Sequence, residues 1–186
     1  YKRQLCNPAF TKRGLTGVFK SDLLPIVANS CLELKVDHQI IVHGNDGLDE
    51  ITTTTSTQLI EVKNGSVREF TFNPQDLGIS ISQPDDIKGG NPSDNANYTK
   101  DVLTGKDNGN KRDIVLLNAA FTILTSGRTD SINDAFQMAE KSIDSVEAYN
   151  MLNELIKLAN HLDSKGLTKE ADYIDDIITV SYTHLR

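Results

Sequence analysis

The 186-residue sequence is poor in cysteine, in long apolar runs and in positive charge. Its two cysteines, Cys6 and Cys31, have neither metal-ligand spacing nor the density of a secreted disulfide scaffold, so we expect two reduced thiols. No apolar run approaches the roughly 18 residues that a membrane span needs. The first residues lack the hydrophobic core of a signal peptide. These absences predict a cytoplasmic protein without a membrane partner.

Positive charge is scarce as well. Nineteen lysines and arginines oppose 26 aspartates and glutamates, which gives a formal net charge of −7. Proteins that bind nucleic acid usually carry a basic face, so this balance predicts no nucleic-acid partner. It leaves phosphate-containing small molecules open, because a bound divalent metal can supply positive charge locally. The composition, 38% hydrophobic and 24% charged, is ordinary for a globular domain of this size.

The first half of the sequence has the pattern of an α/β domain. Apolar residues recur at helical spacing from about Ser21 to Leu34, with Ser21 as the predicted N-cap. The next segment, Gln39–Val42, is a β-branched run that leads into a glycine and predicts a buried strand. This order of helix, strand and glycine loop indicates an α/β fold, with a sheet flanked by helices.

A β-hairpin is predicted further along the chain. Two strand-like runs, near Gln58–Val62 and Val67–Phe72, flank the pair Asn64-Gly65. Asn-Gly tolerates the positive φ angles that a two-residue hairpin turn requires. The hairpin should therefore belong to the same short sheet as the strand over residues 39–42.

The second half is predicted to be helical. A helix that begins at Pro92 should end near Gly105, and residues 112–126 are apolar almost all round, which predicts a buried helix. Residues 131–162 predict one long helix or two. Two amphipathic stripes on either side of Gly166 predict a helical hairpin over residues 151–179. Helix packing or dimerisation is the simplest role for such an extension.

The chemically informative segment is the octapeptide of residues 43–50, His-Gly-Asn-Asp-Gly-Leu-Asp-Glu. It follows a predicted strand directly, and in open α/β sheets ligands bind outside the carboxyl ends of the strands. Its carboxylates, Asp46, Asp49 and Glu50, repel one another unless a cation or water screens them, and such hard oxygen ligands suit Mg²⁺. The same residues also fit a solvated acidic turn whose glycines serve only its geometry. From the residues alone, both interpretations stay open.

Five short motifs, in the same order, resemble those of the anthranilate phosphoribosyltransferase family. Residues 42–50, VHGNDGLDE, resemble the family signature VHG-x-DGLDE. The other four are Asn7-Pro8-Ala9 with Gly17-Val18-Phe19, Gly89-Gly90 with Asn95-Ala96, Lys111-Arg112-Asp113 with Leu117-Asn118-Ala119-Ala120, and Ala139 to Ala148. Each motif is short, but together they resemble the C-terminal part of the family over roughly residues 5–150.

The resemblance implies a fold, a reaction and a metal. The fold would be the C-terminal α/β domain of a phosphoribosyltransferase of the nucleoside-phosphorylase-like type, over residues 5–150. The reaction would transfer the phosphoribosyl group from phosphoribosyl pyrophosphate to anthranilate, in tryptophan biosynthesis. Asp49 and Glu50 match the family's magnesium ligands, whereas no ligand role is carried over to Asp46. We expect His43 to be a packed strand-end residue and the parent protein to be a homodimer.

The sequence also departs from the family pattern. The family's glycine-rich phosphate loop (GTGGD) and its KHGN segment lie upstream of Asn-Pro-Ala, and nothing here matches either. The chain alone is therefore expected to be inactive, and no catalytic or substrate-contacting residue can be assigned. Lys35 and Val146 stand where glycine is usual in the family. Residues 1–4 and 180–186 resemble translated sequencing adaptors, and we expect these ends to be non-native.

Two other interpretations remain at this point. The chain could belong to a catalytically inactive paralogue that binds nucleic acid, although its charge of −7 and its intact Asp49-Glu50 pair oppose this. It could also be a structural or interaction module built on the C-terminal helical hairpin. An assay of pyrophosphate release on the full-length protein separates the paralogue from the enzyme. Intact activity of the full-length enzyme after deletion of residues 151–186 would remove the interaction module.

Overall fold

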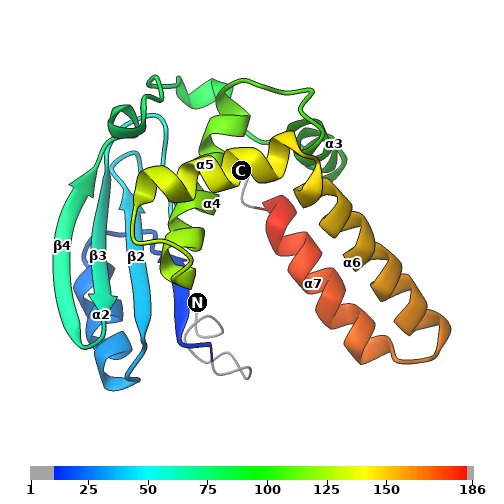
Figure 1. The fold of residues 1–186 in the computed structure, drawn as a ribbon, viewed down its shortest axis with the longest axis horizontal. Helices are drawn as coiled ribbons and strands as arrows, with labels where there is room; N and C mark the ends of the chain where they lie inside the picture. The colour runs from blue at the N-terminus through cyan, green and yellow to red at the C-terminus, as the bar shows by residue number, and fades with distance from the viewer. Residues whose placement is uncertain (1–10, 184–186) are drawn as a thin grey trace. The chain divides into compact units, whose positions relative to one another are not determined.

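A computed structural model describes residues 11–183 of the chain (Figure 1). It divides into two compact units, whose described parts are residues 11–83 with 113–139 and residues 84–112 with 140–183. The helices and strands are β1 (Arg13–Gly17), α2 (Leu23–Glu33), β2 (His38–Gly44), β3 (Thr57–Lys63), β4 (Ser66–Phe72), α3 (Pro92–Leu103), α4 (Asn110–Ser126), α5 (Ile132–Asp144), α6 (Glu147–Ser164) and α7 (Thr168–Thr183). The α/β fold expected from the sequence is confirmed.

The first unit is built on a four-stranded sheet in the order β1-β2-β3-β4. Strands β1 and β2 run parallel and are connected through α2, whereas β2, β3 and β4 pair antiparallel as consecutive neighbours. The predicted hairpin is present, and its turn residues Asn64 and Gly65 have φ angles of 50° and 79°. A two-residue turn with both φ angles positive matches the right-handed twist of the strands it joins.

Strand β1 was not predicted from the sequence. Its five residues, RGLTG, include two glycines and have little intrinsic strand propensity. The strand forms because its backbone pairs in register with β2, from Arg13 opposite His38 to Gly17 opposite Val42. Its existence therefore depends on a partner that lies more than twenty residues away in the sequence.

The sheet is covered on both faces, which explains why the centre of β2, from Ile40 to Val42, is apolar throughout. Ile40 faces a core cluster that contains Phe121 of α4, and both side chains are buried. Ile41, on the opposite face, lies in a second cluster with Ala28 and Cys31 of α2. A strand buried on both sides has no polar face, as is usual where helices cover a sheet (Figure 1). Burial raises the pKa of the Cys31 thiol, which is free.

Helix α2 begins one residue later than predicted. Asp22, and not Ser21, is its N-cap, and no side-chain hydrogen bond caps the helix there. Leu34, which the periodicity assigned to the apolar face, is 51% exposed because it is the C-cap residue, beyond the last full turn. The N-terminal boundary was therefore wrong by one residue, while the core-facing positions around Ala28 were right.

Both positions at which the family usually has glycine have a left-handed backbone here. Lys35, with φ of 51°, follows the C-cap of α2, and the N–H of Val36 donates to the Cys31 carbonyl at 3.2 Å. Val146, with φ of 63°, separates α5 from α6. For comparison, a true glycine, Gly166, ends α6 with a φ of 75°. Lysine and valine thus occupy a conformation that favours glycine, and for a β-branched residue it is strained.

The second unit contains α3 and the hairpin of α6 and α7, whose two helices pack against each other and against α3. The predicted hairpin over residues 151–179 therefore lies within longer helices, which extend from 147 to 164 and from 168 to 183. The helix predicted over residues 131–162 is two helices, with a break at 145–146. Ala159 and Ala171 are buried, and such small side chains allow two helices to pack closely.

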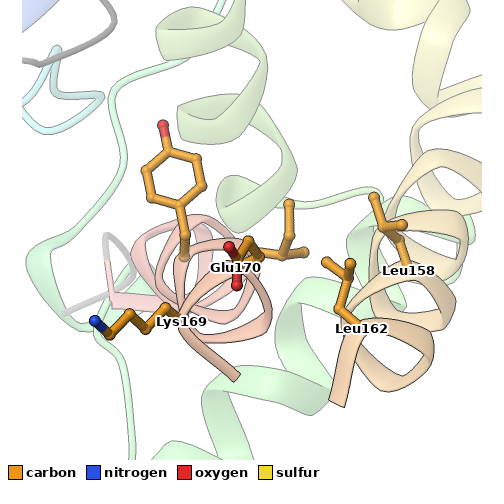
Figure 2. A pocket seen from close by; sticks show the side chains of 6 residues that line it. Leu158, Leu162, Lys169 and Glu170 are labelled. Atoms are coloured by element: carbon orange, nitrogen blue, oxygen red, sulfur yellow. The ribbon is translucent and has the colours of Figure 1, made fainter. Parts of the chain in front are cut away.

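The hairpin has an apolar groove with a volume of about 540 Å³ (Figure 2). Leu158 and Leu162 of α6 line one side of it, and Lys169 and Glu170 of α7 lie on the other. Leu158 is 44% exposed, so the groove is open to solvent. Within residues 11–183, no helix has both the length and the apolar character of a membrane span.

Candidate metal site

The acidic octapeptide lies at the carboxyl edge of the sheet, as predicted, because β2 ends at Gly44. Strand β1 is parallel to β2, so its carboxyl end lies at the same edge, where the N–H of Val18 donates to the Val42 carbonyl at 2.9 Å. His43 is half-buried and its Nδ1 donates to the Val18 carbonyl at 2.8 Å. This contact fits the packed strand-end role expected for His43, and it joins the segments that follow the two strands.

Gly17 brings β1 into direct contact with the backbone of the acidic loop. A Cβ atom built on Gly17 would overlap the carbonyl oxygen of Asp49, far inside the 3.0 Å that real Cβ atoms respect. The loop can therefore adopt this position only above a residue without a side chain. Gly17 belongs to one of the motifs that carried the resemblance, and its packing gives that motif a physical reason.

Asp46 holds the loop together from inside. Its Oδ1 accepts the N–H of Leu48 at 3.1 Å, and its Oδ2 accepts the hydroxyl of Thr52 at 2.5 Å and that of Thr54. The turn also requires Gly47, whose φ is 93°. These bonds engage both oxygens of Asp46 in contacts within the loop.

Helix α4 holds the other end of the loop through one side chain. The N–H of Ile51 donates to Asn118 Oδ1 at 3.0 Å, and Asn118 Nδ2 donates back to the Ile51 carbonyl at 2.9 Å. Nδ2 also donates to the Ile114 carbonyl within the helix, at 2.9 Å. In the sequence, Asn118 stands out only as part of the motif Leu117-Asn118-Ala119-Ala120. Its place in that motif was the one signal that could have singled it out.

Asp49 and Glu50 lie between these two attachments, and both are half-buried. Among residues 11–183, no group of three or more histidine, cysteine, aspartate or glutamate side chains could hold a metal by itself. A metal at this edge would therefore rest on two adjacent carboxylates. That donor set suits Mg²⁺, which takes one or two protein carboxylates and completes its octahedron with water and substrate phosphates.

Residues of two other motifs have structural contacts within the second unit. The N–H of Gly90 donates to Asn95 Oδ1 at 2.7 Å, next to the start of α3. Lys111 donates to the Lys88 carbonyl at 2.6 Å and lies 4.6 Å from the ring centre of Tyr98. Desolvation by burial lowers the pKa of Lys111. Asn-Pro-Ala at residues 7–9 and Cys6 lie outside the described residues.

The sheet and its edge define the class of the molecule. It is an α/β domain that presents a carboxylate loop at the carboxyl ends of two parallel strands, which is where such folds bind their ligands. The chain belongs to the glycosyl transferase family, a/b domain, which it matches over residues 4–149.

Curated relatives of this chain include anthranilate phosphoribosyltransferases. It is 38% identical over 156 residues to an anthranilate phosphoribosyltransferase of Acetivibrio thermocellus, a match that covers 84% of this chain and 45% of the relative. It is 42% identical over 154 residues to the enzyme of that name in Clostridium beijerinckii, covering 83% of this chain and 45% of the relative. The chain thus spans less than half of the relatives it matches, and it corresponds to their C-terminal part.

Solved structures agree with this assignment. The anthranilate phosphoribosyltransferase of Thermus thermophilus superposes with a TM-score of 0.68 at 28% identity, covering 74% of this chain and 40% of that one. The Saccharomyces cerevisiae protein in complex with PRPP and Mg superposes with a TM-score of 0.65 at 26% identity, covering 73% and 39%. The resemblance stated from the sequence motifs is confirmed.

Proposed function

We propose that the protein to which this chain belongs is an anthranilate phosphoribosyltransferase of tryptophan biosynthesis. The observation that carries the proposal is the fixed carboxylate loop: Asp49 and Glu50 lie at the carboxyl edge of the sheet, between Gly17 and Asn118. The names of the relatives support the reaction.

Asp49 and Glu50 would bind Mg²⁺ next to the pyrophosphate of phosphoribosyl pyrophosphate. A magnesium ion held there would stabilise the negative charge that grows on the leaving pyrophosphate. The Saccharomyces cerevisiae structure with PRPP and Mg supports both the metal and the first substrate, and another with 4-fluoroanthranilate supports the acceptor. The amine of anthranilate needs mainly positioning, because the sugar carbon becomes electrophilic as pyrophosphate leaves.

In that reaction, the residues of this chain would hold the metal and fix the position of the loop that carries it. Asp46 uses its carboxylate to shape the turn, so the two ligands reach the edge of the sheet on a rigid loop. Gly17 and Asn118 hold that loop at its two ends. Backbone amides that cradle phosphate are not supplied by any motif recognised here, and we assign them to the half of the relatives that this chain does not match.

We further propose that the complete enzyme is a cytoplasmic homodimer. A buried, free Cys31 suits a reducing compartment, because nothing there has to be oxidised for folding. The dimer rests on the family resemblance alone. Light scattering of the complete protein would measure its mass, and a monomer would remove this part of the proposal.

The activity is tested best in a hybrid protein. The chain replaces the matching C-terminal part of the Acetivibrio thermocellus relative, which supplies the half that the chain does not match. Pyrophosphate release from phosphoribosyl pyrophosphate should then depend on both anthranilate and Mg²⁺. A folded hybrid that binds nucleic acid and releases no pyrophosphate would favour the inactive paralogue instead.

A further inference from the structure

The side chain of Asn118 reaches the acidic loop from α4, and its whole amide is engaged by two backbone residues. Its oxygen accepts one N–H and its nitrogen donates to two carbonyls, which uses both donors of the amide. The contact with Ile51 spans 67 positions of the sequence. It joins the layer of helices to the edge of the sheet at the residue that follows Glu50.

The position of Ile51 matters because of the peptide bond that precedes it. The Ile51 N–H belongs to the planar unit that begins at the Glu50 carbonyl, so fixing that N–H fixes the whole plane. On the other side of Glu50, the carbonyl oxygen of Asp49 lies against Gly17 and belongs to the plane that joins Asp49 to Glu50. Both peptide planes that flank Glu50 are thus held by contacts from outside the loop.

We propose that Asn118 is a positioning residue, which sets the direction of the Asp49 and Glu50 carboxylates by holding the Glu50–Ile51 peptide plane. The proposal rests on the function proposed above. Asn118 lies inside a 17-residue helix, where asparagine is a poorer helix former than leucine or alanine. Its presence there is explained by the three bonds it makes with the backbone.

Two variants remove these bonds in different ways. Asn118→Leu keeps the branching at Cγ in a somewhat larger side chain and improves helix propensity, whereas Asn118→Ser leaves a smaller group if leucine cannot be accommodated. Thr125→Val is the matched control. It changes another polar residue of α4, which is buried where Asn118 is half-buried, and its hydroxyl donates within the helix, to the Thr122 carbonyl at 2.8 Å.

The first measurement uses the 186-residue chain and needs no activity. Amide hydrogen exchange followed by NMR should show the Ile51 N–H protected in the parent chain and in Thr125→Val. In the Asn118 variants its exchange should quicken at least tenfold more than that of the other core amides, with shifts in the signals of Asp49 and Glu50. Unchanged protection of Ile51 in a folded variant would overturn the proposal.

The second measurement separates positioning from plain stability. In the hybrid enzyme, the Mg²⁺ concentration for half-maximal turnover should rise about tenfold in Asn118→Leu, the size typical for loss of a group that orients a metal ligand. The KM of Asn118→Leu for anthranilate should equal that of the parent. The control Thr125→Val should need the same Mg²⁺ concentration as the parent for half-maximal turnover. A magnesium requirement within twofold of the parent would contradict the positioning role.

The failures of the two proposals can be told apart. If Asp49→Asn abolishes turnover while Asn118→Leu leaves the magnesium requirement unchanged, the enzyme assignment stands and the positioning role falls. If the folded parent hybrid has no activity, the proposed function falls, and the exchange of the Ile51 amide alone decides whether Asn118 holds the loop.

Discussion

The carbonyl oxygen of Asp49 occupies the space that a side chain at Gly17 would need. This contact joins the end of β1 to the loop after β2. The loop can pack this closely on β1 only because Gly17 has no side chain. A residue without a side chain of its own can therefore control where two carboxylates lie.

Gly17→Ala should destabilise the chain by about 2 kcal/mol, because a buried methyl group can be accommodated only if the loop or the strand moves. Urea unfolding followed by circular dichroism measures the change. Gly14→Ala, in the same strand, is the matched control: its Cβ would lie 3.2 Å from Gln39 Oε1, and a side chain can move more easily than backbone. Equal losses for the two variants would contradict the close contact at Asp49.

Val146→Gly should stabilise the chain. A left-handed backbone costs an L-residue roughly 1–2 kcal/mol, whereas glycine loses about 0.5–1 kcal/mol through its freedom in the unfolded state. Val146 is only 36% exposed, so the lost packing of its side chain offsets part of this difference, and the net gain should be about 0.5 kcal/mol or less.

Gly166→Val provides the reverse comparison, because Gly166 has a φ of 75° between α6 and α7. This variant should lose about 1 kcal/mol or more by the same reasoning. Thermal unfolding should give a higher midpoint than the parent for Val146→Gly and a lower midpoint for Gly166→Val. A lower midpoint for Val146→Gly would mean that the valine makes contacts worth more than its strain.

The sequence predicted those elements whose signals are local. An unbroken run of β-branched residues identified β2, and Asn64-Gly65 identified the hairpin, since its turn geometry depends on two residues only. It missed β1, which exists through pairing with β2. It left open the break between α5 and α6, because Val146 replaces the glycine that would have marked it.

In the candidate site, too, the sequence predicted the local part and not the part that depends on tertiary contacts. The acidic loop was predicted because its carboxylates are close in the sequence and directly follow a strand, which places them at the edge of the sheet. The motif drew attention to Asn118, but its contact with the loop could not be predicted, since it depends on a helix packing beside Ile51, 67 residues earlier in the chain. Roles that arise from tertiary contact become visible only with coordinates.

The 186-residue chain by itself should show no phosphoribosyltransferase activity and should bind phosphoribosyl pyrophosphate weakly. Asp49 and Glu50 can hold a metal at one side of a pyrophosphate, but phosphate binding also needs backbone amides around it. With two carboxylates and no such cradle, Mg²⁺ keeps most of its waters. Calorimetry with phosphoribosyl pyrophosphate and Mg²⁺ measures this, and micromolar affinity would mean that the chain holds a more complete site.

The central claim is that Asp49 and Glu50 hold the metal that assists departure of pyrophosphate, and the magnesium dependence of turnover in the hybrid enzyme tests it. The double variant Asp49→Asn, Glu50→Gln keeps the size of both side chains and removes both charges. Loss of such charge stabilisation costs on the order of 3 kcal/mol per contact, so turnover should fall by a factor of about one hundred or more at limiting Mg²⁺. Turnover within a few-fold of the parent hybrid, at the same limiting Mg²⁺, would show that these carboxylates are not the metal ligands.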